Sequence, residues 1–367
     1  MKITVSTQKL KEMVARSIKG VGNNKLSPLT SLMCIEVDSG IISLITTDAT
    51  NYLYIVGDKE AIDDFYAVVD ANTFSKLVSR MTCENVTLEV KNNVLHVKGN
   101  GNYKIELPLD ENGEAIKYPD PYSNLCTAGE NFAGTINRTT VQVILDTIKP
   151  ALAVTLENPC YTGYYVHDKI VATDTFKIAS MDVEMFDNAC LISSELMDLL
   201  SVMTQEKINV EISGDDIIFI SSDCIVCGKF MDGIEEYAID AISDLVDTDI
   251  DSFCAIPKAT LVQLLDRLSL FVGPYDKNAV YLTFTKSGLQ VSSKAADGVE
   301  IIDYIESKNF TDFTCSIDIQ MFMQEVKAIQ SDRIELYYGD DNAIKMTDGN
   351  ITIVVALLED ESAEDEE

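Results

Sequence analysis

The chain has 367 residues, of which 46% are hydrophobic, so it is long enough for two or three domains with sizeable cores. No apolar run approaches the roughly 18 residues that span a bilayer, the first residues lack a signal-peptide pattern, and the nine cysteines have no regular spacing, so we expect a cytoplasmic protein without a disulfide framework. The net charge of −32, taken as an average, argues against affinity for nucleic acid.

Six amphipathic helices are expected along the chain. In the first, Leu10, Met13 and Val14 form one apolar stripe, and basic side chains fall on the other side. Asp70, Ser193 and Asp318 have the side chains of N-cap residues in front of three of the helices. The six windows are residues 7–20, 71–82, 137–149, 194–205, 258–271 and 318–331.

Antiparallel strands alternate with these helices. The stretch "VTLEVKNNVLHVKGNGNYKIEL" at 86–107 alternates apolar and polar residues around an Asn-Asn turn and a Gly turn, which predicts three strands. Residues 208–230 and 334–357 show the same pattern. The unit that recurs is therefore a helix followed by antiparallel strands.

Several markers recur about every 124 residues. Thr47-Asp48 returns 126 positions later as Thr173-Asp174, and the three N-cap positions are 123 and 125 apart. A period of this length is that of a whole domain. We therefore predict an α+β protein of three similar domains, each made of two helix-plus-sheet units, at 1–124, 125–248 and 249–358, with an acidic tail at 359–367 that we expect to be disordered.

The two connections between these domains are predicted from composition. The polar, proline-containing segment 108–124 would join the first domain to the second. The acidic segment 240–252 would join the second domain to the third.

Positive charge is concentrated in the helix windows. They hold 11 Lys and Arg against 7 Asp and Glu, while the remainder holds 17 basic and 53 acidic residues. Lys and Arg are good helix formers, which is the plain explanation, but Glu forms helices equally well and is scarce here. If the helices line a concave surface, they would accept a DNA duplex there through its phosphates, without sequence preference.

The chain resembles the bacterial sliding clamp, the β subunit of DNA polymerase III. The resemblance is collinear over nearly the whole chain and is carried by "MKITVSTQKLKEMV", "LSPLTSLMCIEVDSGIISLITTDATNYL", "YYVHDKIVATDTFKIASMD" and "TIVVALL". It implies that each chain is a half ring with helices on its inner face, and that a head-to-tail homodimer encircles duplex DNA. Such clamps tether the replicative DNA polymerase, are opened by a clamp loader ATPase, and need no cofactor or metal because they catalyse nothing.

The resemblance also implies sites. DNA contacts of the family fall on the inner helices and nearby loops, where the matching residues are Lys9, Arg16, Lys19, Lys25, Lys76, Arg80, Arg138, Lys149, Arg267 and Lys327. Partner proteins insert a short peptide into an apolar pocket between the second and third domains, which maps onto Tyr161, Thr173, Thr175, Phe176, Lys177, Ile178, Ile239, Val354, Ala356, Leu357 and Leu358. At the dimer contact, which would pair the edge strands of the first and third domains, we expect Phe271, Val272 and Tyr103.

The chain departs from the family around the peptide pocket. A Gly-His-Arg-Leu run becomes residues 175–178, a Phe-Pro-Asp-Tyr stretch becomes "IEEY" at 234–237, and an acidic tail follows Leu358. These changes predict a preserved pocket with altered specificity, which would fit a clamp encoded by a bacteriophage or mobile element. A bacterial housekeeping clamp is the other origin.

Two other classes of function can be set against a clamp. An acidic scaffold or decoy would bind clamp partners without encircling DNA, and the net charge of −32 favours it. An enzyme finds no support, since there is no phosphate-binding or dinucleotide motif. "CIVC" at 224–227 has metal-ligand spacing but lies in a predicted strand, where the two thiols face opposite ways.

Overall fold

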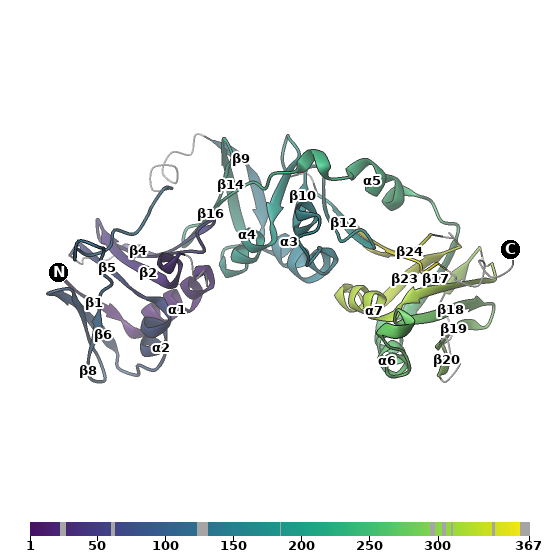
Figure 1. The fold of residues 1–367 in the computed structure, drawn as a ribbon, viewed down its shortest axis with the longest axis horizontal. Helices are drawn as coiled ribbons and strands as arrows, with labels where there is room; N and C mark the ends of the chain where they lie inside the picture. Colours follow the sequence, from purple (N-terminus) through teal and green to yellow (C-terminus); the bar gives the residue numbers. More distant parts are fainter. Residues whose placement is uncertain are drawn as a thin grey trace. The chain divides into compact units, whose positions relative to one another are not determined.

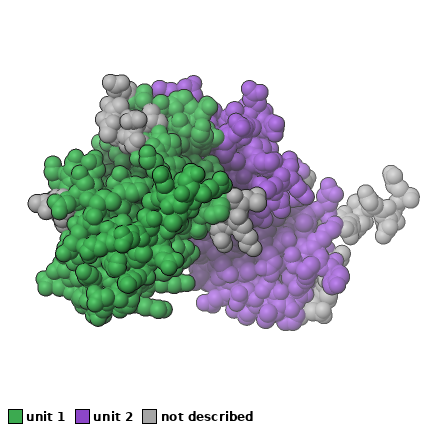
Figure 2. All heavy atoms as spheres, turned by 60° about the vertical axis from the view of Figure 1, so that its left-hand side comes forward, with its two compact units in different colours: residues 1–142, 195–230 green, residues 143–194, 231–367 purple. Residues whose placement is uncertain are grey.

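A computed structural model describes residues 1–22, 27–59, 63–122, 131–183, 185–293, 298–302, 306–309, 311–339 and 342–359, and Figure 1 shows its elements. The chain divides into two compact units, coloured separately in Figure 2. Unit 1 comprises Met1–Gln142 and Glu195–Phe230, and unit 2 comprises Val143–Ser194 and Met231–Glu367.

Every predicted helix window contains a helix. Their bounds are α1 Thr7–Ser17, α2 Ala71–Ser79, α3 Arg138–Val143, α4 Ser194–Leu199, α6 Lys258–Leu268 and α7 Ile319–Ala328. Asp70 and Asp318 accept hydrogen bonds from backbone N–H groups of the first turns of α2 and α7, as N-cap residues do.

A further helix, α5 at Ile239–Asp247, lies in the segment that we predicted as an inter-domain connection. It forms because Ile239, Ile242 and Val246 recur at helical spacing on one side, where Ile242 and Val246 are buried. The segment is rich in acidic residues, which is typical of a linker, and the helical spacing of its apolar residues was therefore not recognised.

All paired strands of unit 1 are antiparallel, in two sheets. The first sheet has the order β1 Lys2–Ser6, β6 Asn85–Lys91, β7 Val94–Lys98 and β8 Asn102–Glu106. The second has the order β5 Phe65–Asp70, β2 Leu32–Asp38, β3 Ile41–Thr47, β4 Tyr52–Lys59, β16 Cys224–Lys229, β15 Asp216–Ile220, β14 Lys207–Ser213 and β9 Phe132–Asn137.

Unit 2 also contains two antiparallel sheets. The larger has the order β13 Cys190–Ser193, β10 Gly163–Val166, β11 Lys169–Thr173, β12 Lys177–Asp182, β25 Ile351–Ala356, β24 Ala343–Asp348, β23 Arg333–Tyr338, β17 Ser252–Pro257 and β21 Glu306–Lys308. The smaller has the order β20 Val299–Ile302, β19 Gly288–Ser293, β18 Ala279–Thr285 and β22 Phe313–Asp318.

Paired helices fill the space beside the sheets. In unit 1, α1 packs against α2 and contacts strands of both sheets, with Leu10 and Phe74 fully buried. In unit 2, α6 packs against α7 in the same way, with Leu264 and Phe322 fully buried. Helices thus pack against antiparallel sheets in both units, which confirms the predicted α+β class.

Neighbouring repeats are joined by strand pairing. β4 pairs with β16 and β12 pairs with β25, so sheets run on across both predicted domain boundaries. This continuity explains why the compact units divide inside the second predicted domain rather than at residues 124 and 248. The boundaries of the three domains stay predictions.

The Thr-Asp steps that revealed the repeat form the same turn twice. Before β4, the Thr47 hydroxyl donates to the Asn51 carbonyl (2.6 Å), and an Asp48 oxygen accepts from the N–H groups of Thr50 and Asn51. Before β12, the Thr173 hydroxyl donates to the Lys177 carbonyl (2.7 Å).

The second turn continues this equivalence. An Asp174 oxygen accepts from the N–H groups of Phe176 and Lys177, as Asp48 does from its own neighbours. The third residue of each turn has a positive φ, +91° for Ala49 and +79° for Thr175. A β-branched residue in this region is strained.

Replacing Thr175 by glycine should therefore stabilise the protein by about 1 kcal/mol, because glycine adopts positive φ without a steric penalty. Ala49→Gly should act in the same direction and by less. Thr50, next to Ala49, has no positive φ, so Thr50→Gly should destabilise. Thermal unfolding midpoints of the three variants check this, and a lower midpoint for Thr175→Gly would contradict the strain argument.

Candidate functional site

The basic residues predicted to contact DNA differ in their exposure and in their partners. Lys19, Arg138 and Lys327 are exposed on or beside α1, α3 and α7. Lys149 is half-buried. Lys25 lies outside the described residues.

Three of the other predicted DNA contacts are engaged in ion pairs inside the chain. The Lys9 ammonium lies 3.1 Å from Asp58. The Arg267 guanidinium donates hydrogen bonds to both carboxylate oxygens of Glu300. Each pair neutralises a charge that a phosphate would otherwise attract.

Arg16 is the clearest departure from the predicted DNA surface. Its side chain is 16% exposed, and its guanidinium lies 2.9 Å from Asp223 and donates to the Val202 carbonyl at 3.0 Å. These contacts tie α1 to the turn before β16 within unit 1. In the described part of the chain Arg16 is therefore a structural cation, and the prediction that it faces DNA does not fit its position.

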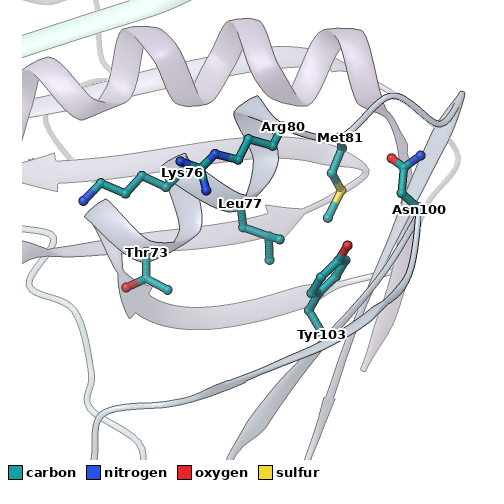
Figure 3. Close-up of a pocket in the computed structure, with 7 residues that line it drawn as sticks. All are labelled: Thr73, Lys76, Leu77, Arg80, Met81, Asn100 and Tyr103. Atoms are coloured by element: carbon teal, nitrogen blue, oxygen red, sulfur yellow. The ribbon is translucent and has the colours of Figure 1, made fainter.

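Lys76 and Arg80 lie on the exposed side of α2 and line a pocket of about 460 Å³. Figure 3 shows Leu77, Met81 and Tyr103 converging on this pocket, with Tyr103 reaching it from β8. Thr73 and Asn100 complete the lining. Because β8 is an edge strand, the pocket lies beside backbone groups that have no strand partner within the described sheet.

Phe271 and Val272, predicted at the dimer contact, follow α6 in unit 2. The Phe271 ring is 51% exposed and packs over Gly298, immediately before β20. Leu270 and Ile301 are also exposed. β20, which contains Ile301, also lies at a sheet edge.

Four predicted pocket residues meet in one apolar cluster of unit 2. Ile178 and Val354 are buried members of the cluster, and Tyr161 and Ile239 are partly buried against it. α5 covers the faces of β12 and β25 that form its floor. Leu357 and Leu358, just past the end of β25, are half-buried.

The strand register separates the remaining pocket candidates by face. Ile178 pairs with Val354, so Phe176 and Ala356, two residues further along each strand, project on the same side. The Ala356 N–H donates to the Phe176 carbonyl, which holds these two ends together. Thr173 is buried within its turn, and Thr175 is the residue of that turn with a positive φ.

Lys177 projects on the opposite face and does not line the cluster. Its ammonium lies 2.9 Å from the Glu325 carboxylate on α7 and also donates to the side-chain oxygen of Gln324 (3.1 Å) and the Pro150 carbonyl. Glu325 is fully buried, and burial raises the pKa of its carboxyl while Lys177 opposes this rise. Lys177 therefore does not lie with the other predicted pocket residues, because β12 turns alternate side chains to opposite faces.

The sequence analysis did not predict that α5 and Tyr237 belong to this cluster. The Tyr237 hydroxyl donates to the Val171 carbonyl at 3.2 Å, and its ring stacks on Tyr165. The helical spacing of Ile239, Ile242 and Val246 was the signal that could have revealed the packing.

The described residues contain no cluster that could hold a metal ion. Cys224 and Cys227 of the "CIVC" stretch are both fully buried, and burial raises the pKa of Cys224 to about 12. A thiol with so high a pKa is unreactive near neutral pH.

Known proteins with the same fold are sliding clamps. The chain is 23% identical over 325 residues to the beta sliding clamp of Bacillus subtilis, covering 82% of this chain and 80% of the relative. The crystal structure of the B. subtilis DNA polymerase sliding clamp matches with a TM-score of 0.83 and 19% identity, over 98% of this chain and 99% of that one. The beta subunit from DNA polymerase of Streptococcus pyogenes matches with a TM-score of 0.85 and 15% identity, over 98% and 100%. No protein-family model matches.

The chain resembles sliding clamps at low sequence identity and has their fold. Its departures are concentrated in side chains rather than in fold, since nearly every residue of the matched structures finds a counterpart. Among the described helices, none is long and apolar enough to cross a membrane.

The Lys177–Glu325 pair generates a prediction on stability. Lys177→Met should cost about 3–5 kcal/mol, because it leaves a buried carboxylate without its cation. The double variant Lys177→Met with Glu325→Leu should recover most of this loss. Chemical denaturation of both variants and of Glu325→Leu gives the coupling energy.

The same pair has a pH dependence. A carboxyl whose folded pKa is raised binds its proton more tightly in the folded state, so its contribution to stability is present at low pH and is lost as pH rises. Without Lys177 this pKa should rise further. The stability deficit of Lys177→Met relative to the unaltered protein should therefore shrink as pH falls, and a deficit that grows on acidification would contradict the assignment.

Proposed function

We propose that the protein is a non-enzymatic DNA sliding clamp, in which a head-to-tail homodimer encircles duplex DNA and slides without sequence preference. The apolar cluster beneath α5 would tether the replicative DNA polymerase and other partners through a short peptide. A clamp loader ATPase would open and close the ring. The match of the whole chain to sliding clamp structures supports this function.

The homodimer is proposed because one chain makes only some of the strand pairings that join its repeats. By the repeat, β4, β12 and β20 are equivalent strands, and so are β8, β16 and β25. Two of the three joins are made within the chain, as β4 with β16 and β12 with β25. β20 and β8 are the members left over, and both lie at sheet edges. Pairing β20 of one chain with β8 of another would repeat the same join and close a ring of two chains.

Side chains beside the two edges suit such a contact. Leu270 and Phe271 near β20 are exposed apolar groups, and the pocket beside β8 is lined by Leu77, Met81 and Tyr103. A volume of about 460 Å³ is ample for one aromatic side chain. Lys76 and Arg80 therefore suit the dimer contact better than the DNA surface that the resemblance implied for them.

The remaining exposed cations on the helices suit DNA. Lys19, Arg138 and Lys327 belong to helix regions of different repeats, and none of the three has an ion pair among the described residues. A thin set of phosphate contacts binds weakly and permits sliding, so retention on DNA would come from topology.

A second candidate is the acidic decoy that binds clamp partners without encircling DNA. The internal pairing of Lys9, Arg16 and Arg267 favours it, because these cations are withdrawn from any DNA surface. Retention on DNA circles separates the two candidates. A clamp assembled by a clamp loader stays on nicked circular DNA and runs off after linearisation, whereas a decoy is retained on neither.

Phe271→Asp should convert a dimer into a monomer, because a carboxylate would be buried against the partner's apolar pocket. Light scattering across a dilution series should give about twice 40.5 kDa for the unaltered chain and 40.5 kDa for the variant. Leu109→Asp, at another exposed apolar side chain, is the matched control and should remain dimeric. A monomeric unaltered chain at every concentration would contradict the ring.

The triple variant Lys19→Glu, Arg138→Glu and Lys327→Glu should weaken DNA binding and its salt dependence. Each phosphate that the variant no longer neutralises lowers the slope of log affinity against log salt by about 0.9. Fluorescence anisotropy with duplex DNA at several salt concentrations measures the slope. Lys286→Glu, at an exposed turn between β18 and β19, is the control, and an equal loss of affinity per substitution in that variant would show a mere effect of net charge.

A further inference from the structure

Exposed apolar side chains extend the cluster beneath α5. Phe176 is 62% exposed and projects on the side of Ile178, while Leu156 is 79% exposed. The register of β10 with β11, continued by two residues, brings the start of β10 beside Thr173 and hence its preceding loop beside the Phe176 turn. That loop is closed by the Ala153 N–H, which donates to the Tyr161 carbonyl at 3.0 Å.

The segment that frames this surface on the other side is uniformly acidic. Between residues 232 and 244 the exposed side chains include five carboxylates and no Lys or Arg. They alternate with the apolar residues that face the cluster, since Ile234 and Ile239 are partly buried against it. The five carboxylates are those of Asp232, Glu235, Glu236, Asp240 and Asp244.

Two of these carboxylates act on groups of the cluster itself. Burial raises the pKa of the Cys160 thiol, and the charge of Glu236 raises it further. Burial also raises the pKa of the Tyr165 phenol, with Asp168, Cys190 and Asp240 adding to the rise. Glu236 and Asp240 are therefore near enough to the cluster to contribute negative charge there.

The basic side chains close to the cluster either project away from it or bind acidic or carbonyl groups of the chain itself. Lys177 is buried against Glu325 on the far face of β12. Lys169 is mostly buried, with its ammonium 3.8 Å from Asp247. Lys345 donates to the Val246 and Thr248 carbonyls at the end of α5, where a cation complements the helix dipole. The charge that a ligand meets at this rim is thus negative.

We infer that the partner segment recognised at this surface is a basic one, which combines bulky apolar residues with flanking lysine or arginine. The apolar residues would pack on Tyr161 and Ile239, which are partly buried at the edge of the cluster, and would contact Phe176. The basic residues would face the carboxylates of 232–244. This inference rests on the proposed function, because it names the chemistry of the peptide that tethers partners to the clamp.

Fluorescence anisotropy with the full chain tests the inference through three labelled peptides. They share one core of leucine, isoleucine and phenylalanine, and are flanked by lysines, serines or glutamates. The lysine-flanked peptide should bind about tenfold more tightly than the glutamate-flanked one at low salt, which is the effect of a few exposed ion pairs. The difference should shrink as salt screens the charges.

Charge reversal locates the effect. Asp240→Lys with Asp244→Lys should invert the preference between the lysine- and glutamate-flanked peptides. Asp63→Lys with Asp64→Lys changes the net charge equally at an exposed site in unit 1 and should leave the preference unchanged. Phe176→Ser should weaken all three peptides without altering their order.

The outcomes separate this inference from the proposed function. Equal affinities for the lysine- and glutamate-flanked peptides, no binding of any peptide, or inversion by the Asp63 and Asp64 control pair would overturn the inference. None of these results bears on retention on circular DNA, which tests the clamp itself. Loss of retention together with a lysine preference would instead overturn the ring and leave the basic-peptide site.

Discussion

Backbone pairing between repeats is the constraint on which the rest of the structure depends. A strand at the end of a repeat exposes a row of N–H and C=O groups, and these groups must find partners. β4 satisfies them with β16, and β12 satisfies them with β25. Each join builds one continuous sheet from two repeats, fixes which side chains share a face, and places the Thr-Asp turns at its start. Three repeats make two internal joins and leave two complementary edges.

An ion pair lies beside each join, partly buried at the first and fully buried at the second. Arg16 of α1 holds Asp223 next to β16, and Lys177 at the start of β12 holds Glu325 of α7. Burial of such pairs is costly unless the geometry is good, so their benefit lies in fixing a helix against a particular strand. Asn51 occupies the place of Lys177 in the first turn, and its side-chain amide donates to the Asp48 carboxylate at 2.9 Å. The two joins therefore share a backbone and differ in side-chain chemistry.

The same pairing has a consequence for function. Cations that are buried or paired inside the chain no longer contribute to an external surface, so few cations of the helices remain for phosphates. At the apolar cluster, the withdrawal of Lys177 leaves the carboxylates of α5 and its approach as the exposed charge. Structural ion pairs thereby alter the electrostatics of two interfaces without altering the fold.

Helices and hairpins were predictable from the sequence because their signals are local. Leu10, Met13 and Val14 recur at helical spacing, Asn92 and Asn93 adopt the positive φ that a tight hairpin turn needs, and Asp318 caps α7 as expected. α5 was missed because acidic composition was given more weight than the spacing of Ile239, Ile242 and Val246. The position of Lys177 was missed because facing depends on register, and register involves a strand about 170 residues away.

The sequence by itself determined the period of about 124 residues, the alternation of helices with antiparallel strands, and the concentration of basic residues in the helices. These properties depend on spacing and composition along a continuous stretch. Only the tertiary structure decided which strands join the repeats, which edges stay open, and which charges are paired internally. Each of those outcomes depends on groups that are distant in the chain and come into contact only when the sheets form. Local sequence patterns do not predict such long-range contacts.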